Sequence, residues 1–83
     1  MFTVYVLYSE KYNKIYIGYT SNIENRMLSH NELSNKGYTK KFRPWILAYS
    51  EEFESKKEAM KREKELKSGK GRRFIWEKII PEL

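Results

Sequence analysis

The stretch from Lys14 to His30, KIYIGYTSNIENRMLSH, constrains the fold most because it joins a short strand to a helix through a glycine. Alternating β-branched and aromatic residues in its first half predict the strand. Ser21 then opens a capping-box pattern, Ser-Asn-Ile-Glu, which predicts a helix from about Asn22 to about Leu33. This single unit carries an unusual concentration of chemistry, namely Tyr16, Gly18, Arg26 and His30.

A second alternating segment, Phe2 to Ser9, predicts a strand whose two faces are both at least partly covered. The polar residues 10–13 then predict a turn, so the two strands should pair as an antiparallel hairpin. With a loop of two or four residues, Tyr5 shares a face with Tyr16 and Gly18. In the four-residue register Tyr5 lies opposite Gly18, where the missing side chain leaves room for a ring or an approaching phosphate.

The rest of the chain supplies the other layers of a small domain. Residues 31–43 predict a loop or frayed helix end, and residues 45–50 alternate as a third strand. A second capping box at Ser55 predicts a helix to about Lys67, and a last apolar helix is expected over 72–80. The expected fold is a single α+β domain over residues 1–83, with a three-stranded antiparallel sheet flanked by about three helices.

Composition excludes several classes of protein. The 83 residues contain no cysteine and one histidine, which excludes disulfides, thiolate metal sites and histidine-rich zinc sites. No apolar run approaches the ~20 residues of a membrane helix, and the first residues lack the features of a signal peptide. A cytoplasmic protein without membrane contact is expected.

The positive charge is concentrated in one block. The formal net charge is +6, and residues 56–73 hold nine Lys or Arg against three Glu. A basic block combined with 16% aromatic residues favours a polyanionic partner such as nucleic acid. The alternative is a solvated helix face built on Glu and Lys pairs, which is common for charge runs alone.

Two ionisable side chains share the stripe of the helix that follows the hairpin. Ile23, Arg26, Met27 and His30 follow one another at i, i+3, i+4 and i+7, so all four are expected to face inward. A buried guanidinium needs a partner, and a substrate phosphate is a natural one. Alternatively, Arg26 pairs with a nearby carboxylate and His30 is an ordinary core histidine.

A carboxylate occupies a comparable place on the basic helix. Glu63 shares a stripe with Ala59 and Leu66, which predicts that it faces the sheet. A lone inward carboxylate suits Mg²⁺, which proteins hold through one or two carboxylates together with waters and phosphate oxygens. The alternative is an ion pair with Lys67 four residues on, worth ~0.3 to 0.5 kcal/mol.

The ordered set Tyr5, Tyr16-Ile17-Gly18, Arg26, His30 and Glu63 resembles the GIY-YIG nuclease domain. That domain occurs in the C subunit of bacterial nucleotide-excision repair, in some homing endonucleases and in small stand-alone bacterial proteins, which this chain resembles most. The resemblance implies hydrolysis of DNA phosphodiesters with one Mg²⁺ or Mn²⁺ ion. It also implies signature tyrosines at Tyr5 and Tyr16, a phosphate-binding Arg26, a site histidine at His30 and a metal ligand at Glu63.

The sequence departs from the family pattern at two places. Thr3 stands where the first signature has glycine, and the tail lacks an asparagine that larger members place after the glutamate helix. The missing glycine contributes no reactive group, so the first departure leaves the expected chemistry unchanged. Because of the second departure, no residue is assigned to the role that this asparagine has in supporting the site. Which tyrosine accepts the proton of the attacking water also stays open: Tyr16 is favoured over Tyr5, and His30 is an alternative proton relay.

The sequence therefore predicts a metal-dependent DNA endonuclease that is weakly sequence-selective or structure-specific, in a repair or recombination role. Specificity is expected to come from DNA structure, from a homodimer or from a partner protein. The alternatives are a non-catalytic basic nucleic-acid-binding module on the same fold and a basic interaction protein with core tyrosines. Nucleic acid is expected to contact a basic and aromatic set: Tyr38, Lys40, Lys41, Arg43, Lys61, Lys67, Lys70, Arg72 and Arg73.

Overall fold

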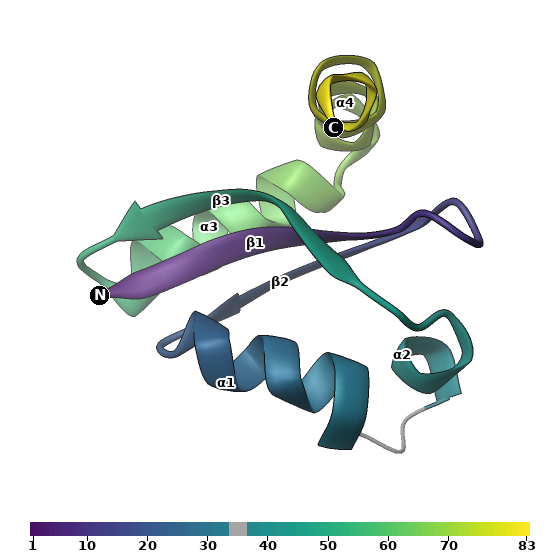
Figure 1. Ribbon diagram of the computed structural model, residues 1–83. Helices are drawn as coiled ribbons and strands as arrows, with labels where there is room; N and C mark the ends of the chain where they lie inside the picture. The colour runs from purple at the N-terminus through teal and green to yellow at the C-terminus, as the bar shows by residue number, and fades with distance from the viewer. Residues whose placement is uncertain (34–36) are drawn as a thin grey trace.

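A three-stranded antiparallel sheet forms the centre of the molecule (Figure 1). The computed structural model describes residues 1–33 and 37–83, with side chains described for 1–31 and 37–83. The strands are β1 (Phe2–Ser9), β2 (Lys14–Thr20) and β3 (Ile46–Phe53), in the order β2-β1-β3. The predicted α+β fold is confirmed. The third strand covers residues 46–53 rather than the predicted 45–50.

The hairpin has the four-residue register, with Tyr5 opposite Gly18. The turn includes Asn13 at a φ of 54°, a left-handed conformation that asparagine tolerates better than most residues. Its side-chain oxygen accepts a hydrogen bond from the Tyr8 hydroxyl at 2.8 Å. The face that carries Tyr5 is therefore also the face that carries Tyr16, as the alternation predicts.

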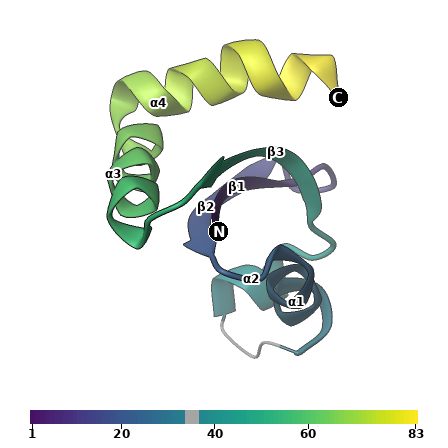
Figure 2. The same ribbon diagram turned by 90° about the vertical axis from the view of Figure 1, so that its left-hand side faces the viewer.

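Helices cover both faces of the sheet. Figures 1 and 2 show α1 and α2 on one side, with α3 and α4 on the other. The last α-helix runs on into two further short helical segments at the C-terminus. The helical segments are α1 (Ile23–Leu28), the π-helical turn η1 (Ser29–Leu33), α2 (Gly37–Lys41), α3 (Lys56–Lys67), α4 (Gly69–Phe74), the π-helical turn η2 (Ile75–Ile79) and the 3₁₀ turn η3 (Ile80–Glu82).

Three predicted details of the helices are wrong. Asn22, not Ser21, caps α1, because the Asn22 side chain accepts a hydrogen bond from the Asn25 backbone N–H at 3.0 Å. The segment predicted as a loop or frayed helix end contains a separate helix, α2, although its residues 34–36 lie outside the described part of the chain. The last helix begins at Gly69 rather than at about residue 72, because Ser68 caps it. The Ser55 cap of α3 is confirmed.

Each face of the sheet has its own hydrophobic cluster. Val4, Val6, Ile15 and Ile17 pack against the helices α3 and α4 and the turn η2 on one face. The other face carries a smaller, more polar cluster built on Tyr5, Leu7 and Trp45, with Tyr16, Ile23, Met27 and Phe42 packed around it. The predicted signature tyrosines thus lie on the less hydrophobic side of the sheet.

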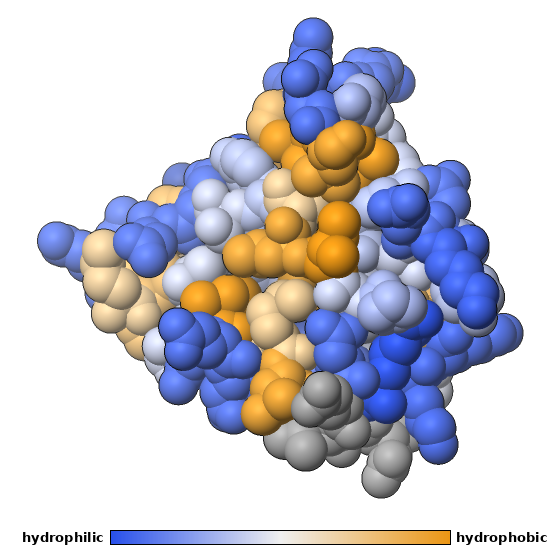
Figure 3. Space-filling view, viewed as in Figure 1, coloured by the Kyte–Doolittle hydropathy of each residue, from blue (hydrophilic) through white to orange (hydrophobic). Residues whose placement is uncertain are grey.

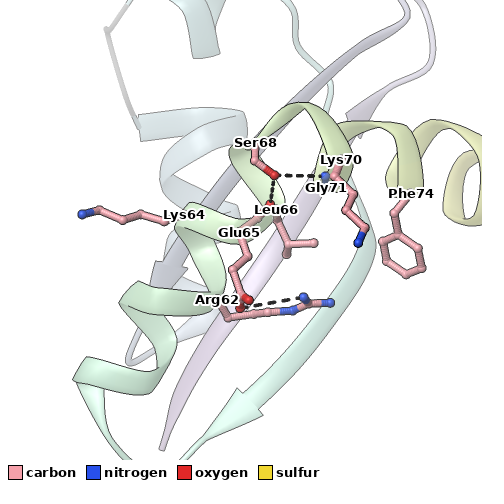
Figure 4. Close-up of a pocket in the computed structure, with 8 residues that line it drawn as sticks. All are labelled: Arg62, Lys64, Glu65, Leu66, Ser68, Lys70, Gly71 and Phe74. Carbon is pink, nitrogen blue, oxygen red and sulfur yellow. Dashed lines mark hydrogen bonds and ion pairs between the residues drawn. The ribbon is translucent and has the colours of Figure 1, made fainter.

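The junction between α3 and α4 is a tight turn (Figure 4). The Ser68 hydroxyl accepts a hydrogen bond from the Gly71 backbone N–H at 3.2 Å and donates one to the Glu65 carbonyl at 2.6 Å. A Cβ atom at Gly71 would lie 2.5 Å from the Leu66 Cα and 2.6 Å from its carbonyl oxygen. Gly71 is therefore the residue that lets the two helices approach so closely.

The face seen in Figure 3 has a hydrophobic band across its centre, between hydrophilic regions. β3 crosses this face, and its residues Ile46 and Leu47 are more than 40% exposed, at 43% and 41%. Within residues 1–33 and 37–83, no helix is both long and apolar enough to cross a lipid bilayer.

Candidate functional site

Two tyrosines from the hairpin form the centre of the candidate site. Tyr5 on β1 is buried at 2% exposure, and its ring stacks on that of Tyr16 from β2, with centroids 6.4 Å apart and planes at 18°. Gly18 lies beneath the Tyr5 ring, because an added Cβ there would be 2.6 Å from the Tyr5 hydroxyl oxygen. The prediction that the missing side chain leaves room for a ring is confirmed.

His30, from the turn after α1, completes this aromatic group. Its Nε2 lies 3.2 Å from the Tyr5 hydroxyl oxygen, and its ring centroid lies 4.6 Å from that of Tyr16. The imidazole is only 4% exposed, so its predicted inward direction is confirmed. The backbone holds it there, since Arg43 Nε donates a hydrogen bond to the His30 carbonyl oxygen at 2.7 Å.

The prediction that Arg26 faces inward is wrong. The side chain is exposed, because the residues of this segment that face the sheet are Ile23 and Met27 of α1 and His30 of η1. Arg26 instead lines a surface cleft together with Thr20, Ser21 and Lys56. An exposed guanidinium needs no buried counter-charge. A substrate phosphate remains a suitable partner for Arg26 because the side chain is accessible from solvent, not because it is buried.

Glu63 on α3 is turned toward the body of the protein. Its side chain is 18% exposed, between the buried Ala59 and Leu66 on the same stripe of the helix. The carboxylate also makes the alternative contact, because Glu63 Oε1 lies 3.5 Å from Lys67 Nζ. Glu63 therefore shows both predicted features: its side chain faces inward, and it forms an ion pair with Lys67 four residues on.

The pKa of Tyr5 differs from that of a free phenol. Burial raises the pKa of the Tyr5 phenol above its ordinary value, and the charges of Tyr16 and Glu63 raise it further, whereas the charge of Arg26 lowers it. That the two phenols, the guanidinium and the carboxylate meet around one point stays a prediction.

A cleft of about 320 Å³ opens beside Tyr16. Lys67, the ion-pair partner of Glu63, is part of its wall, so the carboxylate lies next to this cleft. The remaining wall comes from the hairpin, α2 and α4. The six lining residues are Ile15, Tyr16, Ile17, Tyr38, Lys67 and Arg72.

A metal ion at this site would depend on a single protein carboxylate. Among the described side chains, no three His, Asp or Glu residues gather into a group that could hold an ion. Mg²⁺ commonly keeps several waters and binds through one or two carboxylates plus substrate phosphates. Glu63, whose ion-pair partner Lys67 lines the cleft beside Tyr16, is the carboxylate that would hold such an ion.

The predicted nucleic-acid contacts do not form one group. Tyr38, Lys67 and Arg72 gather at the cleft beside Tyr16. Lys61 lies on another face of α3, and Lys70 lies at the junction with α4 shown in Figure 4. The other members are Lys40, Lys41, Arg43 and Arg73, of which Lys41 lies over the Phe42 ring and Arg43 holds the His30 carbonyl.

Two residues of the site were not predicted from the sequence. Lys56, the first residue of α3, lines the same cleft as Arg26, although the two are far apart in the chain. Trp45 stacks on Tyr38, with centroids 5.9 Å apart and planes at 24°, and is fixed by hydrogen bonds to Asn31. The sequence placed Trp45 only at the start of the expected third strand, and Lys56 only within the basic block of residues 56–73.

Comparisons with known proteins agree with the resemblance seen in the sequence. The family model described as "GIY-YIG catalytic domain" matches residues 1–77. A UPF0213 protein of Staphylococcus haemolyticus is 50% identical over 58 residues, which cover 70% of this chain and 71% of the relative. A UPF0213 protein of Bacillus velezensis is 41% identical over 69 residues, covering 80% of this chain and 70% of the relative.

A solved structure extends the likeness to the fold. The solution structure of a UPF0213 protein from Bacillus halodurans is 31% identical to this chain and superposes with a TM-score of 0.56. The match covers 99% of this chain and 90% of that protein. Sheet and helices are thus shared over almost the whole length.

Proposed function

Since the chain belongs to the GIY-YIG catalytic domain family, whose members include nucleases, we propose that it is a divalent-metal-dependent endonuclease that hydrolyses phosphodiester bonds in DNA. The observation that supports this proposal most is the aromatic group built on the hairpin. Tyr5 stacks on Tyr16, and His30 Nε2 lies 3.2 Å from the Tyr5 hydroxyl oxygen.

Each side chain has a distinct proposed task. Arg26, exposed and beside Lys56, holds a non-bridging oxygen of the scissile phosphate and offsets the charge that grows on it. Tyr16 accepts the proton of the attacking water. Tyr5 is less suited to that task, because it is buried at 2% exposure and has a raised pKa. His30 orients Tyr5 through the 3.2 Å contact and keeps the stacked phenols in place.

Glu63 is the proposed ligand of one Mg²⁺ or Mn²⁺ ion. A divalent cation bound there supplies Lewis-acid stabilisation of phosphate and leaving-group charge. In the absence of an ion, Lys67 neutralises the carboxylate through the 3.5 Å ion pair. Lys67 is 48% exposed, so its ammonium group can turn toward a substrate phosphate when an ion occupies the carboxylate.

A second candidate is the non-catalytic module that binds nucleic acid on the same fold. The Glu63–Lys67 ion pair favours this candidate, because it satisfies the carboxylate without a metal. Under either function, affinity should come mainly from phosphate contacts by the basic residues of α3, α4 and α2. Binding should then be sensitive to salt and weakly selective for sequence, with a second copy or a partner protein supplying specificity in repair or recombination.

The deciding experiment is a nicking assay on plasmid and branched DNA with Mg²⁺ or Mn²⁺. Glu63→Gln and Arg26→Ala are each expected to lower cleavage about 100-fold or more, the usual cost of losing one group that stabilises developing charge. Glu65→Gln is the matched control, because Glu65 lies on the same helix with a side chain that is 55% exposed. It should cleave like the parent.

Binding and folding are measured on the same variants. Loss of cleavage by Glu63→Gln with retained DNA affinity and an unchanged melting temperature supports the enzyme. Full cleavage by Glu63→Gln would remove the metal assignment. If the parent binds DNA but cleaves none of the substrates with either metal, the non-catalytic module is the better description.

A further inference from the structure

Tyr38 on α2 forms a rigid aromatic platform at the cleft beside Tyr16. Its hydroxyl donates a hydrogen bond to the Ile15 carbonyl oxygen at 3.0 Å, which fixes the ring against β2. Trp45 stacks against the ring, and Phe42 meets it edge-on at a centroid distance of 5.0 Å. Despite these contacts Tyr38 is 46% exposed, so part of its ring stays open to an incoming group.

A tyrosine this exposed contributes little to the hydrophobic core. Both buried clusters are complete without it, since Tyr38 belongs to neither. One hydrogen bond and three ring contacts, with Trp45, Phe42 and Tyr16, hold its ring at the edge of the cluster that contains Trp45. An aromatic ring that is fixed in place but exposed loses little conformational entropy when a flat ligand stacks on it.

Two cations border the same cleft. Arg72 Nε donates a hydrogen bond to the Lys67 carbonyl oxygen at 3.2 Å, which places its guanidinium at the end of α3. The ammonium group of Lys67, the second cation, lies 3.5 Å from Glu63 Oε1. The cleft thus combines a flat aromatic surface with positive charge, at a volume near the lower end of the ~300 to 1,000 Å³ usual for small-ligand sites.

We propose that this cleft binds one unpaired nucleotide next to the scissile phosphate, with its base stacked on Tyr38 and its phosphate held by Lys67 and Arg72. The inference rests on the proposed function for the position of the cut and extends it by naming the substrate class. A base inside a duplex stacks on its neighbours and offers no face to a protein ring, whereas an unpaired base does. The preferred substrates are therefore single strands and branched DNA with an unpaired nucleotide at the cut.

The test compares Tyr38→Leu, Tyr38→Phe and Tyr12→Leu in the Glu63→Gln background, so that binding is measured without cleavage. Tyr12 is the matched control, because it is 41% exposed on the hairpin and lies outside the wall of the cleft. The probes are oligonucleotides with 2-aminopurine either in a single strand or in a duplex. Stacking of this fluorescent base on a protein ring quenches its emission, which reports the contact directly.

We expect Tyr38→Leu to weaken single-strand binding about 5- to 150-fold, the effect of losing one base–aromatic stacking contact, and to abolish the quenching. Tyr38→Phe keeps the ring and should retain the quenching, and Tyr12→Leu should bind like the parent. Circular dichroism of each variant verifies the fold. Equal losses for single strand and duplex in Tyr38→Leu, or quenching that persists in it, would overturn the proposal.

The outcomes separate this inference from the proposed function. If the parent never cleaves DNA but the quenching depends on Tyr38, the nucleotide cleft stands and the endonuclease fails. If the parent cleaves DNA and Tyr38→Leu keeps the same ratio of single-strand to duplex cleavage, the endonuclease stands and the nucleotide cleft fails.

Discussion

Replacing Gly18 by alanine tests whether the packing of Tyr5 depends on a missing side chain. The new methyl group would lie 2.6 Å from the Tyr5 hydroxyl oxygen and 2.8 Å from its Cζ. Ordinary contact begins at 3.4 Å, so the hydroxyl would have to move by 0.8 Å, the difference between 3.4 and 2.6. The ring is buried at 2% exposure and has little space to move into.

The expected cost follows from two opposing effects. Overpacking a well-packed site costs about 1 to 3 kcal/mol, and replacing glycine by alanine recovers about 0.4 to 1 kcal/mol through the unfolded state. With the middle of each range, about 2 and about 0.7 kcal/mol, Gly18→Ala should lower the free energy of unfolding by roughly 1.3 kcal/mol. At about 4 to 8 °C per kcal/mol for a domain of this size, the melting temperature falls by roughly 5 to 10 °C.

Thermal denaturation followed by circular dichroism measures the effect, with Gly69→Ala as control. Nothing lies within 4 Å of a Cβ at Gly69, so that variant should be as stable as the parent or slightly more stable. Adding Tyr5→Phe to Gly18→Ala removes the nearest clashing atom and should restore part of the loss. A Gly18→Ala protein that melts no lower than Gly69→Ala would refute this account of the Tyr5 environment.

Three further predictions concern packing and titration. Gly71→Ala should melt lower than Gly18→Ala, because backbone atoms of Leu66 lie 2.5 and 2.6 Å from the new Cβ and cannot swing aside; equal melting temperatures would contradict this. Burial raises the pKa of Glu51, but hydrogen bonds from Tyr49 and Arg62 together with the Arg62 charge outweigh it and leave the pKa below 4.5. The ionised Glu51 therefore stabilises the folded state above pH 4.5, and this stabilisation is lost as the pH falls further. Arg62→Ala should make the free energy of unfolding, measured between neutral and acid pH, depend less on pH. Because the pKa of Tyr5 is raised in the folded state, its contribution to stability is present below pH 10.0 and is lost at higher pH. In an ultraviolet titration of the folded protein, Tyr5→Phe should therefore remove the tyrosine that ionises last.

The strands, α1 and α3, and their order, could be predicted from the sequence because they depend on local patterns, whereas α2 was missed. Period-two alternation defined β1 and β2, and the capping box at Ser55 defined the start of α3. The alternation placed Tyr5, Tyr16 and Gly18 on one face but left two registers open, and the structure has the one with Tyr5 opposite Gly18. Helix periodicity likewise predicted that His30 is buried and that Glu63 lies among apolar neighbours.

Only the tertiary structure decided how many residues of each predicted inward-facing helix face are covered by the sheet. Helical periodicity gave Arg26 and His30 the same face, but the width of the contact leaves Arg26 in solvent beside Lys56. The platform at Tyr38 likewise depends on Trp45 and on the backbone of β2, which approach it only when the chain is folded. Local sequence determines the direction of a side chain along its own element, whereas burial and clefts depend on neighbours that are distant in the chain, and these set the chemistry of the site.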